Sequence, residues 1–437
     1  MTRATLFLVR FALVGLLAWG AKSWAGTETV LHSFSGADGA EPLTGVVVDS
    51  SGNIYGSTPF GDSTFFELTP PAAGQSAWNE TNLYPSIGVA TGVPMANLVM
   101  DSHGALYGTT ANAMAQPTSV SIFQLKPPVA GRTAWTYDTI YSCPTEPNYQ
   151  TALGLAIDSD NVLYGVTYFG NGTCPATTDN GQGTIFQLTP PKGRQTSWTM
   201  SVIHQFGYQG SGQNPLGVII GKHHVLYGTT SRGYLGTGEI FEVTPPAKGQ
   251  TIWTEAEIYP YGATVLDYYF PQNNLVQDSR GALYGTTNEG GRRCPKSWNY
   301  GSVACGTVFK LTPPHAGQSS WTEEVIYSFK GEADGGMPVA GLLVDSSGAL
   351  YGTTQYGGNP CHLLSTPARG CGVVFKLTPR NTARTRWTET ALYDFQDNGS
   401  DGWAPMSSLA IDANGALYGT TAHGGTSGGG TVFMVTQ

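Results

Sequence analysis

The chain has 437 residues, of which 59 are glycine, 12% are charged and 40% are hydrophobic. This composition is typical of an all-β globular protein with many tight turns, and it excludes a disordered or fibrous chain. The formal net charge of −9 makes the surface a poor partner for nucleic acid or for an anionic membrane.

The first 25 residues differ from the rest. Arg3 gives a positive start, residues 11–19 form an apolar run, and residues 23–25 resemble a small-residue cleavage site. Because the run is too short to span a bilayer, we predict a secretory signal peptide over residues 1–25. We therefore expect a secreted or periplasmic protein with no membrane span after signal removal; a retained membrane anchor is the alternative.

After this segment one short phrase recurs. Ala-Leu-Tyr-Gly-Thr-Thr stands at residues 282–287, and variants of it place the repeated tyrosine at Tyr55, Tyr107, Tyr164, Tyr227, Tyr284, Tyr351 and Tyr418. Such recurrence indicates a repeat architecture. Around each phrase, four short runs rich in Val, Ile, Thr, Tyr and Phe are bounded by turn-forming residues, which predicts four β-strands. We name these strands A to D in chain order.

Each unit follows the same plan. Strand A ends in Asp and a turn, strand B carries the Tyr-Gly-Thr-Thr phrase, and strand C reads Gly-Thr-Val-Phe-Lys-Leu at residues 306–311. Strand D opens at a tryptophan, which is Trp78, Trp135, Trp198, Trp253, Trp321 or Trp387. Because the phrase recurs in every unit, we interpret it as scaffold. Its glycine is expected to permit close approach of a neighbouring sheet, and the Asp to cap the turn.

The two ends of the chain complement each other. Residues 27–34 match a strand D without the preceding strands, whereas the last unit has strands A, B and C but no D. We predict a seven-bladed β-propeller of four-stranded antiparallel blades over residues 26–437, closed by the N-terminal strand joining the last blade. One alternative is a ring in which the Trp strand is the first of each blade. The other is an open β-solenoid.

Loop lengths distinguish the two faces of such a ring. The A–B and C–D connections keep nearly constant spacing, although Gly221 replaces the Asp in the fourth unit. The B–C connection varies most, from Tyr55 to Phe66 in the first unit but from Tyr284 to Phe309 in the fifth. We call the face with the A–B and C–D connections the turn face, and the face with the B–C and D–A connections the loop face. Insertions in repeat proteins mark the binding face, so we expect binding on the loop face.

These units resemble the GloVer tandem repeat of bacterial exported proteins. The resemblance is carried by Leu-Tyr-Gly-Thr-Thr-x-x-Gly-Gly followed by Gly-Thr-Val-Phe-Lys-Leu, most plainly at residues 283–311 and 350–377. It covers essentially the whole chain after residue 25. The family often carries a C-terminal surface anchor, but this chain ends at Gln437 within the last repeat, so we do not expect surface anchoring. The resemblance implies no catalytic residues.

All six cysteines follow the predicted signal peptide. An even number of cysteines in an exported chain predicts disulfides, and no Cys-x-x-Cys spacing indicates a metal site. The predicted pairs are Cys143–Cys174, Cys294–Cys305 and Cys361–Cys371, all on the loop face.

Two groups of residues are candidates for a site on the loop face. The first is acidic: Asp38 with Glu41, Glu332 with Asp334, and Asp397 with Asp401 lie in D–A loops that we expect to be neighbours in the closed ring. Clustered carboxylates can hold Ca²⁺, so Asp38, Asp334 and Asp401 are candidate metal ligands, and Ca²⁺ is the candidate cofactor. The alternative is turn chemistry repeated with the unit.

The second group is aromatic and offers flat rings for stacking against a sugar or a protein. The alternative is a small core that covers the loops. The candidate ligand-binding residues are Tyr234, Tyr261, Tyr268, Tyr269, Phe270, Trp298 and Tyr300.

The sequence contains no Gly-x-Ser-x-Gly, His-Glu-x-x-His or phosphate-loop motif, and we assign no catalytic residue. We predict an exported, non-catalytic propeller that binds a glycan or protein partner through its loop face. One alternative is a propeller enzyme, such as a lyase, lactonase or hydrolase, with a site at the channel mouth. The other is a structural or adhesive cell-envelope protein.

Overall fold

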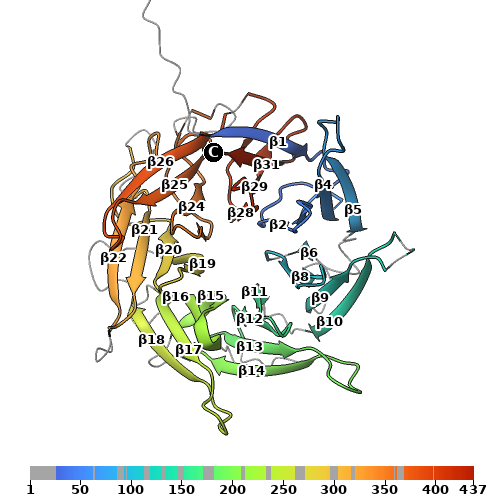
Figure 1. Cartoon of the computed structure of the whole chain (residues 1–437), viewed down its shortest axis with the longest axis vertical. Helices are drawn as coiled ribbons and strands as arrows, with labels where there is room; N and C mark the ends of the chain where they lie inside the picture. The colour runs from blue at the N-terminus through green and yellow to red at the C-terminus, as the bar shows by residue number, and fades with distance from the viewer. Residues whose placement is uncertain are drawn as a thin grey trace, which may run out of the picture.

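The strands form a ring of seven blades around a central axis (Figure 1). The computed structural model describes residues 26–437 except 63, 86–92, 95, 113–118, 130, 132, 145–151, 171–181, 208–211, 233–237, 261–270, 296–303, 316–319, 359, 362–368 and 397. Within a blade, strands A to D are antiparallel neighbours in chain order, with A at the centre and D outermost. The predicted all-β, seven-bladed fold is confirmed.

Blade 1 consists of β2 (Val47–Val48), β3 (Ile54–Thr58), β4 (Thr64–Thr69) and β5 (Asn79–Pro85). Blade 2 consists of β6 (Val93–Pro94), β7 (Val99–Met100), β8 (Leu106–Asn112), β9 (Ser119–Lys126) and β10 (Thr136–Pro144). Blade 3 consists of β11 (Ala152–Ile157), β12 (Leu163–Thr167), β13 (Thr184–Thr189) and β14 (Thr199–Gln205). In blade 2, both β6 and β7 pair with β8, so two short strands share the place of strand A.

Blade 4 consists of β15 (Gln213–Ile220), β16 (Leu226–Arg232), β17 (Glu239–Thr244) and β18 (Thr254–Pro260). Blade 5 consists of β19 (Pro271–Gln277), β20 (Leu283–Thr287), β21 (Thr307–Thr312) and β22 (Thr322–Ser328). Blade 6 consists of β23 (Leu343–Val344), β24 (Leu350–Thr354), β25 (Val373–Pro379) and β26 (Trp387–Asp394). A 3₁₀ turn, η1 (Lys222–His224), forms the A–B turn of blade 4.

Blade 7 takes its strands from both ends of the chain. Its order is β28 (Ala410–Ile411), β29 (Leu417–Thr421), β31 (Thr431–Thr436) and β1 (Thr27–Ser33). β1 runs antiparallel to β31, with Thr27 opposite Thr436 and Ser33 opposite Thr431, and the two strands lie side by side in Figure 1. The short strands β27 (Gly402–Trp403) and β30 (His423–Gly424) form a separate two-stranded sheet.

The Trp-bearing strands settle the order of strands within a blade. Each of them pairs with strand C of its own unit, as β14 pairs with β13 and β22 with β21. A blade that begins with the Trp strand is therefore wrong, and the pairing of β1 with β31 contradicts an open solenoid.

The hydrophobic core consists of clusters between adjacent blades. Strands B are buried along their length, as in β3, β20 and β24. In the cluster between blades 7 and 1, Leu31 and Phe34 pack with Ile54 and Phe66. Because each cluster needs side chains from two blades, neighbouring blades stabilise one another.

The glycine of the repeated phrase has a different role from the one expected. A Cβ built at Gly285 would lie 2.4 Å from the Cζ atom of Phe309, and one at Gly56 would lie 2.4 Å from the Cζ atom of Phe66. Each phenylalanine belongs to strand C of the same blade, so the glycine accommodates a ring within its own sheet, not a neighbouring sheet.

The first threonine of the phrase links blades around the axis. The Thr286 hydroxyl donates to the Ala340 carbonyl at 3.1 Å, and the Thr420 hydroxyl donates to the Thr44 carbonyl at 3.1 Å. The second of these bonds joins blade 7 to blade 1. The repeated phrase therefore supplies contacts both within and between blades, as expected of a scaffold element.

Candidate functional site

The turn face is built from one repeated hydrogen-bond motif. In blade 5, Asp278 Oδ1 accepts from the backbone N–H groups of Arg280 and Ala282 at 2.9 and 3.0 Å, and Oδ2 accepts from the Tyr284 hydroxyl at 3.0 Å. Burial and Asp278 together raise the pKa of Tyr284 to about 12, so the phenol remains a donor at neutral pH. The same Tyr–Asp pair occurs in blades 1, 2, 3, 6 and 7. The predicted capping role of the aspartate is confirmed.

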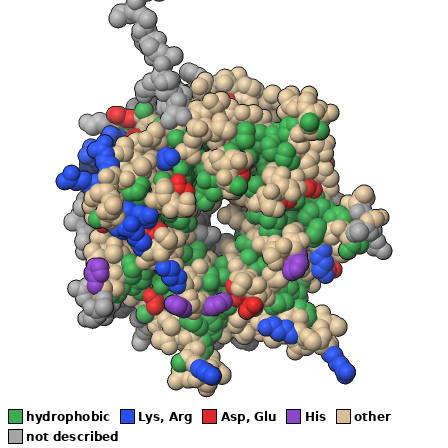
Figure 2. Space-filling model, in the orientation of Figure 1, with side chains coloured by type: hydrophobic (Ala, Val, Ile, Leu, Met, Phe, Trp, Pro, Cys, Tyr) green, Lys and Arg blue, Asp and Glu red, His purple; other side chains and the backbone are tan. Residues whose placement is uncertain are grey.

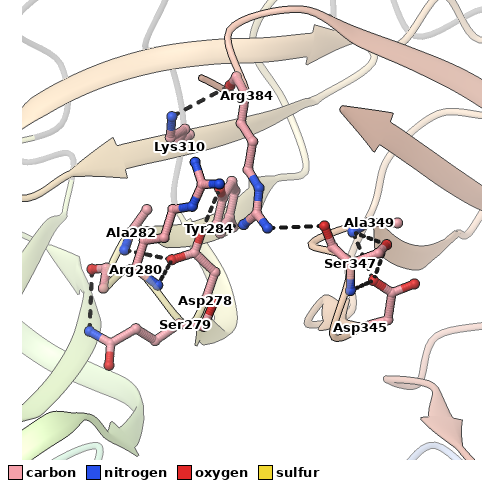
Figure 3. Close-up of polar contacts among 12 residues, drawn as sticks. Asp278, Ser279, Arg280, Ala282, Tyr284, Lys310, Asp345, Ser347, Ala349 and Arg384 are labelled. Carbon is pink, nitrogen blue, oxygen red and sulfur yellow. Dashed lines mark hydrogen bonds and ion pairs between the residues drawn. The ribbon is translucent and has the colours of Figure 1, made fainter. Parts of the chain in front are cut away.

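A buried ion pair joins blades 5 and 6 on this face (Figure 3). Arg384, in the C–D connection of blade 6, donates from Nη1 to Asp278 Oδ2 at 2.5 Å and from Nη2 to the Ser347 carbonyl at 3.0 Å. The side chains of Arg384 and Asp278 are only 8% and 2% exposed. Lys310 Nζ and Trp387 Nε1 both donate to the Arg384 carbonyl. The arginine segment therefore ties strands β21 and β26 to the A–B turns of blades 5 and 6.

Two other junctions on the turn face, between blades 2 and 3 and between blades 4 and 5, leave an open groove. The groove between blades 2 and 3, of about 600 Å³, is lined by residues that include Asp101, Tyr107 and Trp198. The groove between blades 4 and 5, of about 640 Å³, is lined by Tyr227, Trp321 and two carboxylates, those of Glu242 and Glu257. The Tyr–Trp ring pairs are 5.9 Å apart at both junctions and at the junction that Arg384 fills. The grooves are thus a by-product of the repeat geometry.

Figure 2, which shows the ring in the orientation of Figure 1, has a hollow at its centre. Lys and Arg side chains gather over the part of the ring that holds β21 and β25. The exposed residues Arg280, Arg380 and Arg386 belong to this part of the chain. A basic area thus stands on a surface whose overall charge is negative.

The loop face carries a set of rings that the sequence analysis missed. They occupy the fifth position after the repeated tyrosine, and we call Phe60, Phe169, Tyr356 and His423 the aromatic rim. Phe60 is 51% exposed and Phe169 is 39% exposed, and they are the two aromatic residues among the exposed large hydrophobic side chains of the described part. The spacing from the repeated tyrosine was the signal that could have found them.

Neighbouring groups support individual members of the aromatic rim. Phe169 packs edge-on against Tyr168 at 4.6 Å, and the Arg369 guanidinium lies 5.6 Å from the centre of the Tyr356 ring. His423 lies 4.3 Å from Trp403 across the sheet of β27 and β30. Half-exposed rings backed by a cation or a second ring can stack against a flat ligand.

Disulfides brace the B–C connections of two adjacent blades. Cys294 pairs with Cys305 in blade 5, and Cys361 pairs with Cys371 in blade 6, which confirms both predictions. Cys143 is also disulfide-bonded but lies within β10 and not in a loop, and its predicted partner, Cys174, lies outside the described residues. The third pairing stays a prediction.

The predicted aromatic cluster falls on residues that the structure does not describe. Its members, from Tyr234 through Tyr261, Tyr268, Tyr269 and Phe270 to Trp298 and Tyr300, lie outside the described residues. Their role in binding therefore stays a prediction.

The three predicted metal ligands lie in three different D–A loops. Asp38 accepts from the Ser35 N–H and interacts with His32 Nε2 at 2.9 Å. Asp334 accepts from the Tyr327 hydroxyl and Asp401 from the Tyr393 hydroxyl, at 2.8 and 2.7 Å. Each aspartate thus orders its own loop, and no group of three or more His, Cys, Asp or Glu residues in the described part is arranged to hold a metal.

Strand D contributes a second set of acids that the sequence analysis did not single out. Glu255 and Glu389 end the segments Trp253-Thr254-Glu255 and Trp387-Thr388-Glu389, and Glu28 takes the equivalent place in Gly26-Thr27-Glu28. Burial raises the pKa of Glu28 to about 8 and of Glu255 and Glu389 to about 7. One carboxylate oxygen of each is buried without a hydrogen-bond partner. The Trp-x-Glu spacing is visible in the sequence, but the burial of the glutamate side chain depends on the neighbouring blade.

Comparison with known proteins gives one family. The sequence model of a family described as the Gloeobacter/Verrucomicrobia repeat matches residues 21–197, 94–295 and 297–437. A search of curated proteins found no match. Within the described residues, no helix has the length and apolar character needed to cross a membrane.

Several solved structures have a similar shape. The extracellular domain of a B. thetaiotaomicron protein named as a one component system is 13% identical with a TM-score of 0.54, and the match covers 95% of this chain and 42% of that one. A Thermus thermophilus protein named as a putative oxidoreductase (glucose dehydrogenase) is 18% identical with a TM-score of 0.42, and the match covers 79% of this chain and 97% of that one. The first likeness shows the fold alone, and the second carries no argument. The present chain spans less than half of the first structure.

Proposed function

Because this chain belongs to the Gloeobacter/Verrucomicrobia repeat family, we propose that it is an exported, non-catalytic propeller that binds a glycan or protein partner on its loop face. The aromatic rim is the observation that supports this proposal most directly. Its rings stand at equivalent positions of four blades, and two of them, Phe60 and Phe169, expose much of their surface.

The chemistry of the loop face fits this role. The turn face uses its polar side chains in the repeated Asp–Tyr motif, whereas the loop face carries connections of variable length that are braced by disulfides. Disulfides are typical of an oxidising compartment outside the cytosol. Exposed rings on stiffened loops gain contact area with little loss of conformational freedom, as rigid aromatic anchors do at other interfaces.

Binding to a panel of polysaccharides and envelope proteins tests the proposal. We expect the double variant Phe60→Ala with Phe169→Ala to bind its ligand about tenfold or more weakly, because losing one anchoring ring costs at least about 1.4 kcal/mol. Titration calorimetry with the ligand found in the panel gives the dissociation constants.

The matched control is Ile252→Ala, which removes a side chain that is 77% exposed in the C–D connection of blade 4, on the turn face. It is expected to bind as the native protein does. A second pair, Tyr269→Ala with Trp298→Ala, tests the predicted loop cluster. Equal binding by all these variants, or turnover of a bound ligand, would contradict the proposal and favour the turn face or an enzyme. Self-association without any ligand would favour an adhesive envelope protein.

A further inference from the structure

The repeated Asp–Tyr motif of the turn face has room for one more hydrogen-bond donor. Each oxygen of a carboxylate can accept two hydrogen bonds. Asp278 Oδ2 accepts both from the Tyr284 hydroxyl and from Nη1 of Arg384, and this arginine fills the junction of blades 5 and 6 (Figure 3). The chain itself therefore shows that a guanidinium group fits beside the motif.

Two other junctions also hold a basic side chain from within the chain. Between blades 3 and 4, His224 Nδ1 lies 3.6 Å from Asp158 Oδ2. Between blades 6 and 7, Lys376 Nζ lies 5.1 Å from the centre of the Tyr351 ring and donates to the side chain of Gln437 in blade 7. A basic side chain beside the motif is thus a recurring arrangement, although a different element supplies it each time.

The junction of blades 2 and 3 has the motif without such a side chain. Asp101 Oδ1 accepts from two backbone N–H groups of its turn, and Oδ2 accepts from the Tyr107 hydroxyl at 2.9 Å. Gln195 takes the sequence position of Arg384, three residues before the tryptophan of strand D, and it is exposed. Among the residues that the structure describes, no basic side chain forms an ion pair with Asp101. One acceptor position of Oδ2 is therefore free.

The groove of about 600 Å³ at this junction gives access to that position. The Tyr107 and Trp198 rings that line it are 5.9 Å apart, as are the equivalent rings at the junction that Arg384 fills. Lys126 also lines the groove, but its Nζ lies 2.6 Å from Asp138 Oδ2, so these two charges offset each other. The charge left over is that of Asp101, and the groove therefore favours a cation.

One residue makes this groove different from the filled junction. In blade 6, the Arg384 guanidinium lies over Gly348, where an added Cβ would overlap it. Blade 3 has Asn161 at the equivalent position, and Asn161 lines the groove. An incoming guanidinium cannot take the identical place, but it meets an amide oxygen, which is an acceptor like the Ser347 carbonyl that Arg384 uses.

We propose that the groove between blades 2 and 3 binds an arginine side chain of a partner polypeptide. The guanidinium donates to Asp101 Oδ2 and to Asn161, and its plane lies against the Trp198 ring, because a planar fork suits two acceptors beside an aromatic face. The groove is larger than one side chain, so it also admits the adjoining backbone of the partner. The site lies on the turn face and does not depend on binding at the loop face.

Binding of blocked tripeptides to the full chain, followed by ligand-detected NMR, tests the proposal. The probes are acetyl-Gly-Arg-Gly-amide and the same peptide with citrulline or lysine in place of arginine. We expect one arginine peptide to bind per chain, and added salt to weaken it. The citrulline peptide has the same shape without the charge and should bind about tenfold or more weakly. The lysine peptide lacks the planar fork and should also bind more weakly.

A pair of variants locates the site. Asp101→Asn is expected to bind the arginine peptide about tenfold or more weakly, because the charged acceptor is lost. Asp345→Asn is the matched control. It changes the equivalent carboxylate at the junction where Lys376 lies over Tyr351, and it should bind the peptide as the native protein does.

Two further variants separate this site from misfolding and from the loop face. Lys126→Met leaves Asp138 without its cation and removes a positive charge from the groove, so it is expected to bind the arginine peptide more tightly, a gain that misfolding does not produce. Phe60→Ala with Phe169→Ala alters the loop face and should leave peptide binding unchanged.

Three results would overturn the proposal. They are the absence of arginine-peptide binding, equal binding of the citrulline or lysine peptide, and equal binding by Asp101→Asn and Asp345→Asn. Because the loop-face variant is scored separately, failure of the groove and failure of the loop-face proposal give different results.

Discussion

Replacing Phe34 with alanine is expected to lower the free energy of unfolding by about 3–5 kcal/mol, the cost of removing a fully buried phenylalanine ring. Phe34 follows β1, is 0% exposed, and lies 5.2 Å from Phe66 of blade 1. Its N–H donates to the Gly430 carbonyl at 3.0 Å, and its carbonyl accepts from Gly429. The backbone of Phe34 thus attaches the N-terminal segment to blade 7, and its ring packs on blade 1. Chemical denaturation measures the loss.

Two control variants compare this loss of stability with the loss of a buried ring in another blade and of a half-exposed ring. Phe395→Ala removes an equally buried ring from an internal blade, where the Phe395 N–H donates to Gly372 in the same way, and should cost a similar amount. Phe60→Ala removes a half-exposed ring and should cost less than about 1 kcal/mol. A cost below about 1 kcal/mol for Phe34→Ala would contradict the packing of the N-terminal segment between blades 7 and 1.

The second large effect is expected at the buried ion pair. Arg384→Met removes the partner of Asp278, leaves its 2% exposed side chain without the guanidinium, and should cost about 3–5 kcal/mol. Removing the negative charge as well, in Arg384→Met with Asp278→Asn, should recover a large part of that loss, because no unpaired charge then remains buried. Denaturation of the two single variants and the double variant measures the coupling.

An exposed ion pair provides the comparison. Lys126 Nζ and Asp138 Oδ2 are 2.6 Å apart, but their side chains are 51% and 44% exposed. Lys126→Met should therefore change stability by less than about 1 kcal/mol. If Arg384→Met is equally mild, or the double variant is as unstable as Arg384→Met alone, the ion pair does not hold blades 5 and 6 together.

Much of the fold could be predicted because the same pattern of strands and turns recurs in seven units of the sequence. The count of strands was sufficient to identify residues 27–34 as a strand D, and the structure pairs β1 with β31. The glycine of the phrase was assigned to a contact between sheets, whereas its actual neighbour is a Phe ring on strand C, such as Phe309. That contact depends on which way the ring points, and strand periodicity does not give the rotamer.

The candidate sites were harder to predict for a physical reason. Residues that differ between units are not revealed by a repeated pattern, and the aromatic rim stands two positions beyond the end of the Tyr-Gly-Thr-Thr phrase. Arg384 was missed because the C–D connection has uniform length, although blade 6 replaces its second proline with Arg380.

Hydrogen exchange of the full chain tests ring closure most directly, because every assignment of faces and junctions depends on it. β1 amides are bonded to β31 in the structure, so we predict that a peptide covering residues 26–34 exchanges as slowly as one covering residues 431–436. Amides in stable sheet exchange only through opening of the structure, whereas frayed ends exchange almost at once. Fast exchange of residues 26–34 beside a protected β31 would contradict a ring closed by the N-terminal strand.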